Sequence, residues 1–533
     1  MLIRDAKGGM PVKFFKEENR KYMILTIICI ITVISVWVMK YKTESNYLNS
    51  NANWHVLLTV QAYDETPASV HKFLPLVSLG DEFDKGIQWA EMVSDKEGNY
   101  YYTSFSAAGF VLPYFFFKLF HLPTNEHSLY IFSTVLCCLA LLFTIKLFVD
   151  LFVKYLKKET IIVIATLLFA FQTEIMHGMG QVYWHQSLLQ VLLPLQFLCF
   201  HHFHETKKWK IGFYILAFVM PYVEWTGFIA NVGFALVLFL RHGIKIQKED
   251  FMWAFWTGVC TAASLAVLCG HYLMIVDWNN FTGALRDRVA MRTTYAYATL
   301  FQLVWGYWKS FKVIWYMLPA FGLCAFALNK GFKWIKEWIS MLPMLFVMAF
   351  PLIENLAMKE HAISYTYDRM KLIYPLMMVI FILIAAVPKE MVWYKNCVIV
   401  LMLVGSIWSV HSYTQNAEYR WDAPYRLDNE VLAEYCKENY HEESIYGLKG
   451  AAVRGYVNVL FDKSVYEHMS DEELVNIAKE RAAKYAVMIS VASVPDPANV
   501  WNMYGFSKVT VYDLENNTEI QLTVENGEVV LAK

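Results

Sequence analysis

Charged residues are scarce in this sequence: they make up 17% of its 533 residues, whereas ~25% is usual for a soluble domain. There is no basic tract and no zinc-finger spacing, so the usual signatures of nucleic-acid binding are missing. Of nine cysteines, eight lie inside apolar segments, which excludes a disulfide framework. Internal repeats of the apolar runs are also absent. These absences argue against a soluble, secreted or repeat protein.

Hydrophobic residues are abundant at 57% and form repeated long apolar runs, which predicts a polytopic α-helical membrane protein. The first run extends from Tyr22 to Met39, just long enough to cross ~30 Å of hydrocarbon. Basic residues precede it, and Lys40 and Lys42 follow it without a small-residue cleavage site. We therefore expect a retained first span whose N-terminus faces the cytoplasm.

The remaining apolar runs predict further spans, for a total of about eleven. These runs are residues 128–153, 160–171, 187–203, 211–240 (a short hairpin of two), 251–276, 310–328, 338–356, 372–387 and 396–411. Alternate loops are rich in Lys and Arg, as expected for cytoplasmic loops of a multi-pass plasma-membrane protein. Residues 106–120 are apolar but short and contain proline, so we expect a helix lying at the outer surface.

Three parts are predicted from these changes in composition. Residues 1–21 form a cytoplasmic leader, residues 22–412 form the transmembrane domain with a long first outer loop at 41–127, and residues 413–533 form a small extracytoplasmic α/β domain. In that last part we expect helices at 427–439 and from Ser470, and strands at 485–491 and 509–512. A hairpin is expected at 519–531 around Asn526-Gly527.

Two adjacent carboxylates, Asp64 and Glu65, follow the first span. Their side chains diverge on any regular backbone, so one can accept a proton or ligate a cation while the other orients a neighbour. A helix beginning near Pro67 would place His71 and Lys72 one turn further on, close to the acids. The alternative is an ordinary solvated loop.

Several cations lie in loops that we place outside, against the positive-inside rule. They are Arg286, Arg288, Arg292, Arg369 and Lys371. Arginine offers a bidentate fork to phosphate, so these residues are candidates to bind an anionic group at the membrane surface. Attraction to lipid headgroups is the alternative.

Other ionisable residues are expected at or below the outer interface, where charge is costly and marks a site or a water-filled cavity. These are Glu174, His185 and Glu224. The string 361–371 adds His361, Tyr365 and Asp368 at the start of a span. Its alternative is an aromatic belt in which Asp368 pairs with Arg369.

A short leader, one span and an outer loop with an acidic pair resemble the GT-C glycosyltransferases. The chain is most similar to the branch of protein O-mannosyltransferases and lipid A aminoarabinose transferases. Its Asp64-Glu65 pair with His71 matches the acidic motif that this branch carries in its first loop. Residues 100–109, 117–120 and 123–127 are similar to the branch's juxtamembrane helix and the start of its second span. Ala107-Ala108 stand where that helix usually has Pro-Pro.

The resemblance implies an inverting transferase that moves a sugar from a polyprenyl-phosphate donor to a hydroxyl of a glycan, lipid or protein acceptor. Asp64 would be the general base, and Glu65 would hold the acceptor or a neighbouring cation. Other acceptor or donor contacts would be His71, Lys72, Tyr101, Tyr102, Glu174, His185, Glu224, His361, Tyr365 and Asp368. The five outer cations would neutralise the departing lipid phosphate.

Metal use is left open by the sequence. Asp64, Glu65 and Glu224 offer oxygen ligands suited to Mg²⁺ or Mn²⁺, but no dedicated cage is visible. Two other functions also stay open: a transporter or flippase of a lipid-linked saccharide, and a non-catalytic cell-envelope assembly protein. A transporter usually shows internal repeats, which are missing here.

Overall fold

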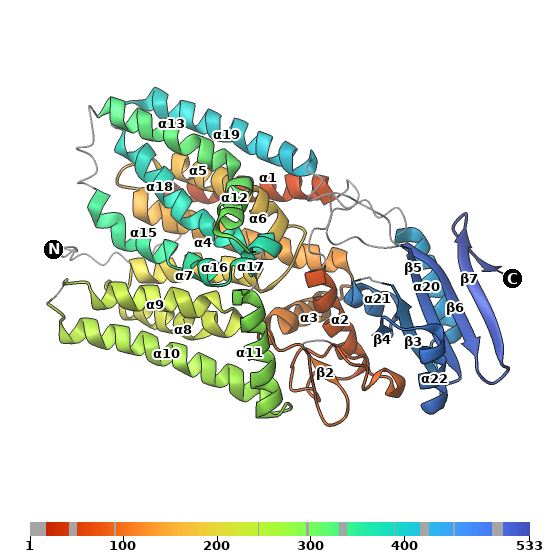
Figure 1. The fold of residues 1–533 in the computed structure, drawn as a ribbon. Helices are drawn as coiled ribbons and strands as arrows, with labels where there is room; N and C mark the ends of the chain where they lie inside the picture. The colour runs from red at the N-terminus through yellow and green to blue at the C-terminus, as the bar shows by residue number, and fades with distance from the viewer. Residues whose placement is uncertain are drawn as a thin grey trace. The chain divides into compact units, whose positions relative to one another are not determined.

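The computed structural model of the chain describes residues 17–41, 51–89, 92–243, 245–294, 298–329, 338–387, 390–415, 426–450, 453–492 and 505–532. The chain divides into two compact units (Figure 1). Unit 1 takes Met1–Thr43, Tyr130–Leu268 and Val289–Gln415, and unit 2 takes Glu44–Leu129, Cys269–Arg288 and Asn416–Lys533. Most of the predicted leader, 1–16, lies outside the described residues.

Unit 1 is built from helices, most of which overlap the apolar runs of the sequence, whereas those within 173–178, 278–294, 300–310 and 359–372 lie in segments predicted as loops. The helices of unit 1 are α1 (Glu17–Tyr41), most of α4 (Glu126–Phe152), α5 (Lys158–Ala170), α6 (Thr173–Gly178), α7 (His185–His201), α8 (Lys207–Val223), α9 (Thr226–Phe239), most of α10 (Lys248–Tyr272), the end of α11 (Trp278–Thr294), α12 (Leu300–Ser310), α13 (Lys312–Leu328), η2 (Ile339–Met341), α15 (Leu342–Ala349), α16 (Leu352–Ala357), α17 (Lys359–Ser364), η3 (Thr366–Leu372), α18 (Ile373–Ala386) and α19 (Val392–Gln415). Helices satisfy every backbone group internally, as apolar surroundings require.

Within the described residues, five helical stretches are long and apolar enough to cross a membrane. They are Arg20–Val38, Glu126–Phe152, Lys248–Tyr272, Thr366–Ala386 and Val392–Gln415. A sixth results if α12 and α13, which meet at a bend of 83°, count as one span. The chain is thus a multi-pass membrane protein, and the total of eleven spans stays a prediction.

Unit 2 begins with α2 (Asn51–Glu65), followed by η1 (Glu82–Asp84), the short pair β1 (Val93–Ser94) and β2 (Tyr100–Tyr101), and α3 (Ala108–Phe120). The helix expected at 106–120 is therefore present, with Pro113 inside it. Helix α2 packs on α3 and on α21 (Arg454–Phe461). Residues 44–129 and the C-terminal part of the chain consequently share one folded unit.

The C-terminal part of unit 2 carries a six-stranded sheet with the order β4-β3-β5-β6-β7-β8 (Figure 1). Its strands are β3 (Ser444–Lys449), β4 (Val465–Glu467), β5 (Tyr485–Ala492), β6 (Gly505–Asp513), β7 (Thr518–Glu525) and β8 (Glu528–Ala532). Strand β3 pairs in parallel with β4 and β5, and the other pairs are antiparallel. Successive β5 residues 486–489 are all buried, so both faces of the sheet are covered.

The predicted elements of this domain are confirmed. Helix α20 (Arg426–Tyr440) occupies the predicted range, and Ser470 caps α22 (Asp471–Glu480) in a capping box with Glu473. The hairpin β7–β8 turns at Asn526-Gly527, where both residues have positive φ. Strand β3 was missed because five of its six residues are buried in succession, which removes the alternating pattern.

Candidate functional site

Asp64 lies in the last turn of α2, and its carboxylate faces α3 and the segment after it. Its Oδ1 is 2.6 Å from Lys118 Nζ, and its Oδ2 accepts a hydrogen bond of 3.3 Å from Thr124 Oγ1. The side chains of Asp64 and Lys118 keep 34% and 53% of their surface exposed. The carboxylate is therefore held in a defined direction while it stays within reach of a substrate.

Glu65 points to a different set of partners. The backbone N–H of Gly80 donates to its Oε2. Desolvation by the surrounding chain, the charges of Asp462 and Asp84 and a side-chain hydrogen bond shared with Asp462 together raise the pKa of Glu65 to about 8. A Cβ at residue 80 would lie 3.0 Å from Glu65 Oε2, so glycine permits this close approach. As predicted, the adjacent acids diverge and acquire different chemistry.

His71 and Lys72 do not follow on a helix as expected. Residues 66–73 form turns, because Lys72 and Phe73 adopt left-handed φ angles of 52° and 60° that a helix does not accommodate. His71 Nδ1 instead lies 2.7 Å from Tyr101 Oη, and that hydroxyl donates to Asp95 Oδ2 at 3.0 Å. Burial lowers the pKa of His71.

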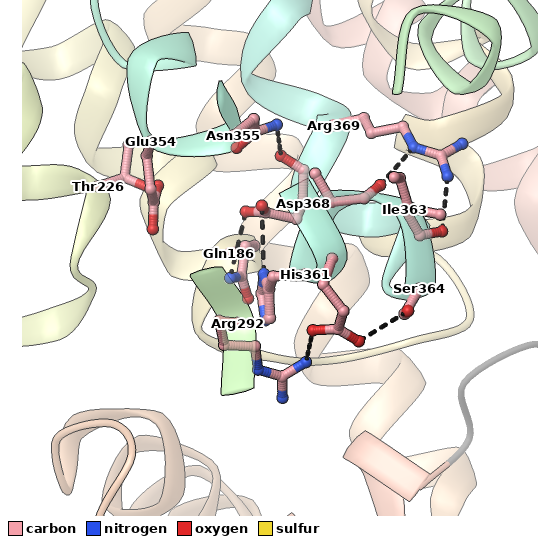
Figure 2. A network of polar contacts seen from close by, with 12 residues as sticks. Gln186, Thr226, Arg292, Glu354, Asn355, His361, Ile363, Ser364, Asp368 and Arg369 are labelled. Carbon is pink, nitrogen blue, oxygen red and sulfur yellow. Dashed lines mark hydrogen bonds and ion pairs between the residues drawn. The ribbon is translucent and has the colours of Figure 1, made fainter. Parts of the chain in front are cut away.

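A second set of predicted residues comes together inside unit 1, where the helices are broken (Figure 2). Asp368 and Lys371 lie on η3, and residues three apart on a 3₁₀-helix eclipse one another. Asp368 Oδ1 is accordingly 3.0 Å from Lys371 Nζ. The same ammonium is 2.5 Å from Glu354 Oε2 and donates to Thr226 Oγ1 at 3.0 Å.

Glu224, at the break between α8 and α9, joins this network through Gln186. The Gln186 amide donates to Glu224 Oε1 at 3.4 Å and to Asp368 Oδ1 at 3.5 Å. His361 Nδ1 lies 3.2 Å from Asp368 Oδ2, and Figure 2 shows it pointing at that carboxylate. The network thus unites Glu224, His361, Asp368 and Lys371, four of the predicted site residues.

Three carboxylates here are close enough to hold a metal ion. Oxygens of Glu224, Glu354 and Asp368 lie within 4.8 Å of one another, and this is the one such group among the described residues. However, Lys371 Nζ already contacts two of these carboxylates. The Lys371 ammonium already supplies the positive charge that a divalent ion would provide to these carboxylates. The group therefore fits a metal ion poorly, and we assign no metal to it.

Arg369 holds the backbone of the same region. Its Nε donates to the Ala362 carbonyl at 2.6 Å, and its Nη2 donates to the Ile363 carbonyl at 2.9 Å (Figure 2). A Cβ at Gly306 would lie 2.7 Å from its Cζ, so the guanidinium rests directly on α12. Arg369 therefore ties η3 to the end of α17.

The other predicted residues lie as follows. Glu174 Oε1 accepts a hydrogen bond of 2.8 Å from Ser310 Oγ, and His185 is fully buried at the start of α7. Arg292 Nη1 is 2.5 Å from Glu360 Oε2, and the Arg292 guanidinium lies 4.9 Å from the ring centroid of Tyr365. Arg288 Cζ lies 5.5 Å from the ring centroid of Tyr102, and Arg286 is exposed beside Asp287.

The sequence interpretation missed five residues that the structure brings to these sites. They are Lys118, Thr124, Gln186, Thr226 and Glu354. Lys118 is the lone cation of an apolar helix, and Glu354 is the lone acid in the run 338–356, so charge isolation was a usable signal. Neutral Gln186 and Thr226 carried no comparable signal.

No family model and no curated protein sequence matches this chain. Among solved structures, ArnT from Cupriavidus metallidurans bound to undecaprenyl phosphate aligns with a TM-score of 0.57 at 9% identity, covering 95% of this chain and 97% of that one. The oligosaccharyltransferase AglB from Archaeoglobus fulgidus, in complex with an inhibitory peptide and a dolichol-phosphate, aligns with a TM-score of 0.55 at 10% identity, covering 89% and 70%.

A further structure of the Archaeoglobus fulgidus oligosaccharyltransferase, complexed with Zn and sulfate, aligns with a TM-score of 0.51 at 11% identity, covering 87% of this chain and 68% of that one. These neighbours are members of the GT-C superfamily. At such low identities the likeness concerns the fold, and the chain has the GT-C fold.

Proposed function

We propose that this protein is an inverting glycosyltransferase that moves a sugar from a polyprenyl-phosphate donor to an acceptor hydroxyl at the outer membrane face. One observation carries the proposal: on a GT-C fold, an exposed carboxylate, Asp64, stands at the end of α2 within 2.6 Å of Lys118. The solved neighbours hold undecaprenyl phosphate or dolichol-phosphate, which supports a lipid-phosphate donor.

In the proposed reaction Asp64 accepts the proton of the acceptor hydroxyl. The hydroxyl oxygen forms a bond to the anomeric carbon, and the bond from that carbon to the phosphate oxygen breaks. The electron pair of the broken bond leaves with the polyprenyl phosphate, which gains one negative charge. Attack from the opposite face inverts the anomeric centre.

The departing phosphate requires nearby cations, because its charge rises in the transition state. We assign Lys118 to this task, since its exposed ammonium already contacts Asp64 and can turn toward an incoming phosphate. Exposed Arg286 is the second cation that we assign. For Arg288 and Arg292 the phosphate role stays a prediction, and we reassign Arg369 and Lys371 to holding the polar network of unit 1.

Glu65 is assigned to the acceptor as a hydrogen-bond donor. With a pKa of about 8, it is largely protonated at neutral pH. A neutral carboxylic acid can donate to a sugar oxygen, which an ionised carboxylate cannot do. Ligation of Mg²⁺ or Mn²⁺ by Asp64 and Glu65 stays a prediction, and it would require Glu65 to give up this proton.

The test is sugar transfer in membranes from cells that make wild type, Asp64→Asn or Glu65→Gln at equal protein levels. Acceptor glycans are read by mass spectrometry. We expect Asp64→Asn to lower transfer by about 10²–10⁴-fold, the usual contribution of a general base. Glu65→Gln keeps a neutral donor and should retain most of the transfer at pH 7.

Loss of one hexose- or pentose-sized addition in Asp64→Asn would identify the sugar that is transferred. Unchanged glycans in both variants would contradict the proposal and favour transport or envelope assembly. Lys479→Met, at an exposed position of α22, serves as a matched control that should leave the glycans unchanged.

A further inference from the structure

A buried arginine in unit 2 has one half of its guanidinium unpaired. Arg454 opens α21, and its Cζ lies 4.2 Å from the ring centroid of Trp89. Its Nη1 donates to the Gln88 carbonyl at 2.7 Å and contacts Glu467 Oε2 at 3.3 Å. Its Nε and Nη2 are buried and have no hydrogen-bond partner among the described residues. These two groups form one edge of the guanidinium, the fork that matches a carboxylate or phosphate.

Neighbouring indoles add further donors. The Nε1 atoms of Trp54 and Trp89 are also buried without a partner among the described residues. Trp54 contacts Tyr456 of α21 at a ring distance of 4.8 Å, and Trp89 lies beneath Arg454. Buried donors are normally satisfied, because leaving them unpaired is costly. Four unpaired N–H donors around α21 therefore call for a ligand rich in acceptor oxygens.

Positive charge surrounds the adjacent His55. Its ring lies 5.6 Å from Trp89 and 5.5 Å from Tyr102, and Arg288 Cζ is 5.5 Å from the Tyr102 ring. Burial, together with the charges of Arg288 and Arg454, lowers the pKa of His55 to about 4. His55 is thus neutral at pH 7 beside two guanidinium groups. The N-terminus of α21 adds to this positive potential.

The edge of the cluster is partly exposed, whereas its unpaired donors are buried. His55 and Arg288 are only partly buried, whereas Trp89 and Tyr102 are 6% exposed. Aromatic faces pack against the apolar faces of sugar rings, so the surroundings suit a saccharide.

We propose that Arg454, Trp54, Trp89 and Tyr102 bind an anionic group, a carboxylate or a phosphate, on the acceptor saccharide. The inference rests on the proposed transferase function and specifies its acceptor as an acidic glycan. The first outer loop and the C-terminal domain supply these four residues, which gives the C-terminal domain a role in acceptor binding. The donor phosphate is the other source of such an anion, but its prenyl chain requires apolar surface, and this cluster consists of rings and N–H donors.

The test uses the full-length chain in detergent micelles and isothermal titration calorimetry with three probes: glucuronate, inorganic phosphate and uncharged glucose. We expect glucuronate to bind more tightly than glucose. Arg454→Met, which keeps the stem on Trp89 and removes the fork, should weaken glucuronate binding by at least about tenfold. Arg454→Lys keeps the charge without the fork, and its affinity for glucuronate should lie between those of wild type and Arg454→Met. Exposed Lys479→Met should bind as wild type does.

If Arg454→Met does not fold, as judged from its thermal midpoint, Trp89→Phe takes its place, because it keeps the ring and removes the N–H donor. That variant should weaken glucuronate binding several-fold. Binding of phosphate alone would assign the anion to a phosphorylated glycan. Equal affinity in wild type, Arg454→Lys and Trp89→Phe, or no binding of either anion, would overturn the inference.

Two further measurements distinguish this anion site from the proposed transferase function. Asp64→Asn should bind glucuronate as wild type does, so a failed transfer experiment and a failed binding experiment have different meanings. Polyprenyl phosphate added to the micelles should not displace glucuronate. Competitive displacement would assign the cluster to the donor phosphate and would also overturn the acceptor assignment.

Discussion

At the scale of single residues, adjacent Asp64 and Glu65 show how a shared sequence position leads to different chemistry. Asp64 contacts an ammonium and a hydroxyl, whereas Glu65 accepts from a backbone amide near further carboxylates. The first arrangement suits a charged base, and the second favours a protonated acid. The two roles follow from surroundings that the local sequence does not contain.

This difference predicts a pH effect on transfer. The pKa of Glu65 is raised from its usual ~4.3 to about 8, so its proton is lost as the pH rises through 8. We expect the transfer rate to fall between pH 7 and 9, because Glu65 then no longer donates and adds a charge beside Asp64. In Glu65→Gln this fall should disappear. A wild-type profile that is flat across this range, measured with saturating donor, would contradict the assignment.

At the scale of elements, a buried lysine joins the segment around η1 to the C-terminal sheet within unit 2. Lys463 is 0% exposed, and its Nζ lies 2.7 Å from Asp81 and 3.1 Å from Asp84 at η1. The backbone N–H of Ser464 also donates to Asp84 Oδ1 at 2.8 Å. These contacts place the loop that carries Gly80, and hence the partner of Glu65.

Removal of this lysine should destabilise unit 2. Lys463→Met leaves two carboxylates without their cation, and breaking a buried ion pair costs about 3–5 kcal/mol. Burial already raises the pKa of Asp84 to about 7, and loss of the ammonium raises it further. Protonation then relieves the penalty, so the loss of stability should be large at pH 8 and smaller at pH 5.

The measurement is chemical unfolding of both proteins in detergent at the two pH values. Exposed Lys479→Met is the control and should change the free energy of unfolding by no more than about 0.5 kcal/mol. The same loss at pH 5 and pH 8 would show that the packing of the lysine stem, and not its charge, stabilises this junction.

At the scale of the whole molecule, the GT-C fold gathers sequence-distant segments into two units. Residues 44–129 and the last part of the chain fold together in unit 2, although about 290 residues of mostly helical chain separate them. The short linking segment 269–288 contributes to the same unit. In the proposed function, unit 2 carries the base and the acceptor contacts, and unit 1 carries the apolar spans.

This division predicts the orientation of the chain. Alkaline phosphatase fused after Lys533 should be active in a bacterial host, because unit 2 is expected on the outer face. Green fluorescent protein at the same place should stay dark. Fusions after Glu205, in the segment between α7 and α8 that is predicted to be cytoplasmic, should give the opposite pattern. Fluorescence from the C-terminal fusion would invert the predicted topology.

The sequence by itself determined the membrane class, the positions of the long apolar helices, most of the C-terminal strands and the acidic pair that follows the first apolar run. These properties depend on runs of apolar residues, on periodicity and on caps such as Ser470, which are local in the chain. The tertiary structure alone decided which charges meet. Asp64 meets Lys118, Lys371 meets Glu354, and Arg454 stacks on Trp89 because chain folding brings distant segments into contact. Such pairings depend on three-dimensional distance, which composition and spacing do not encode.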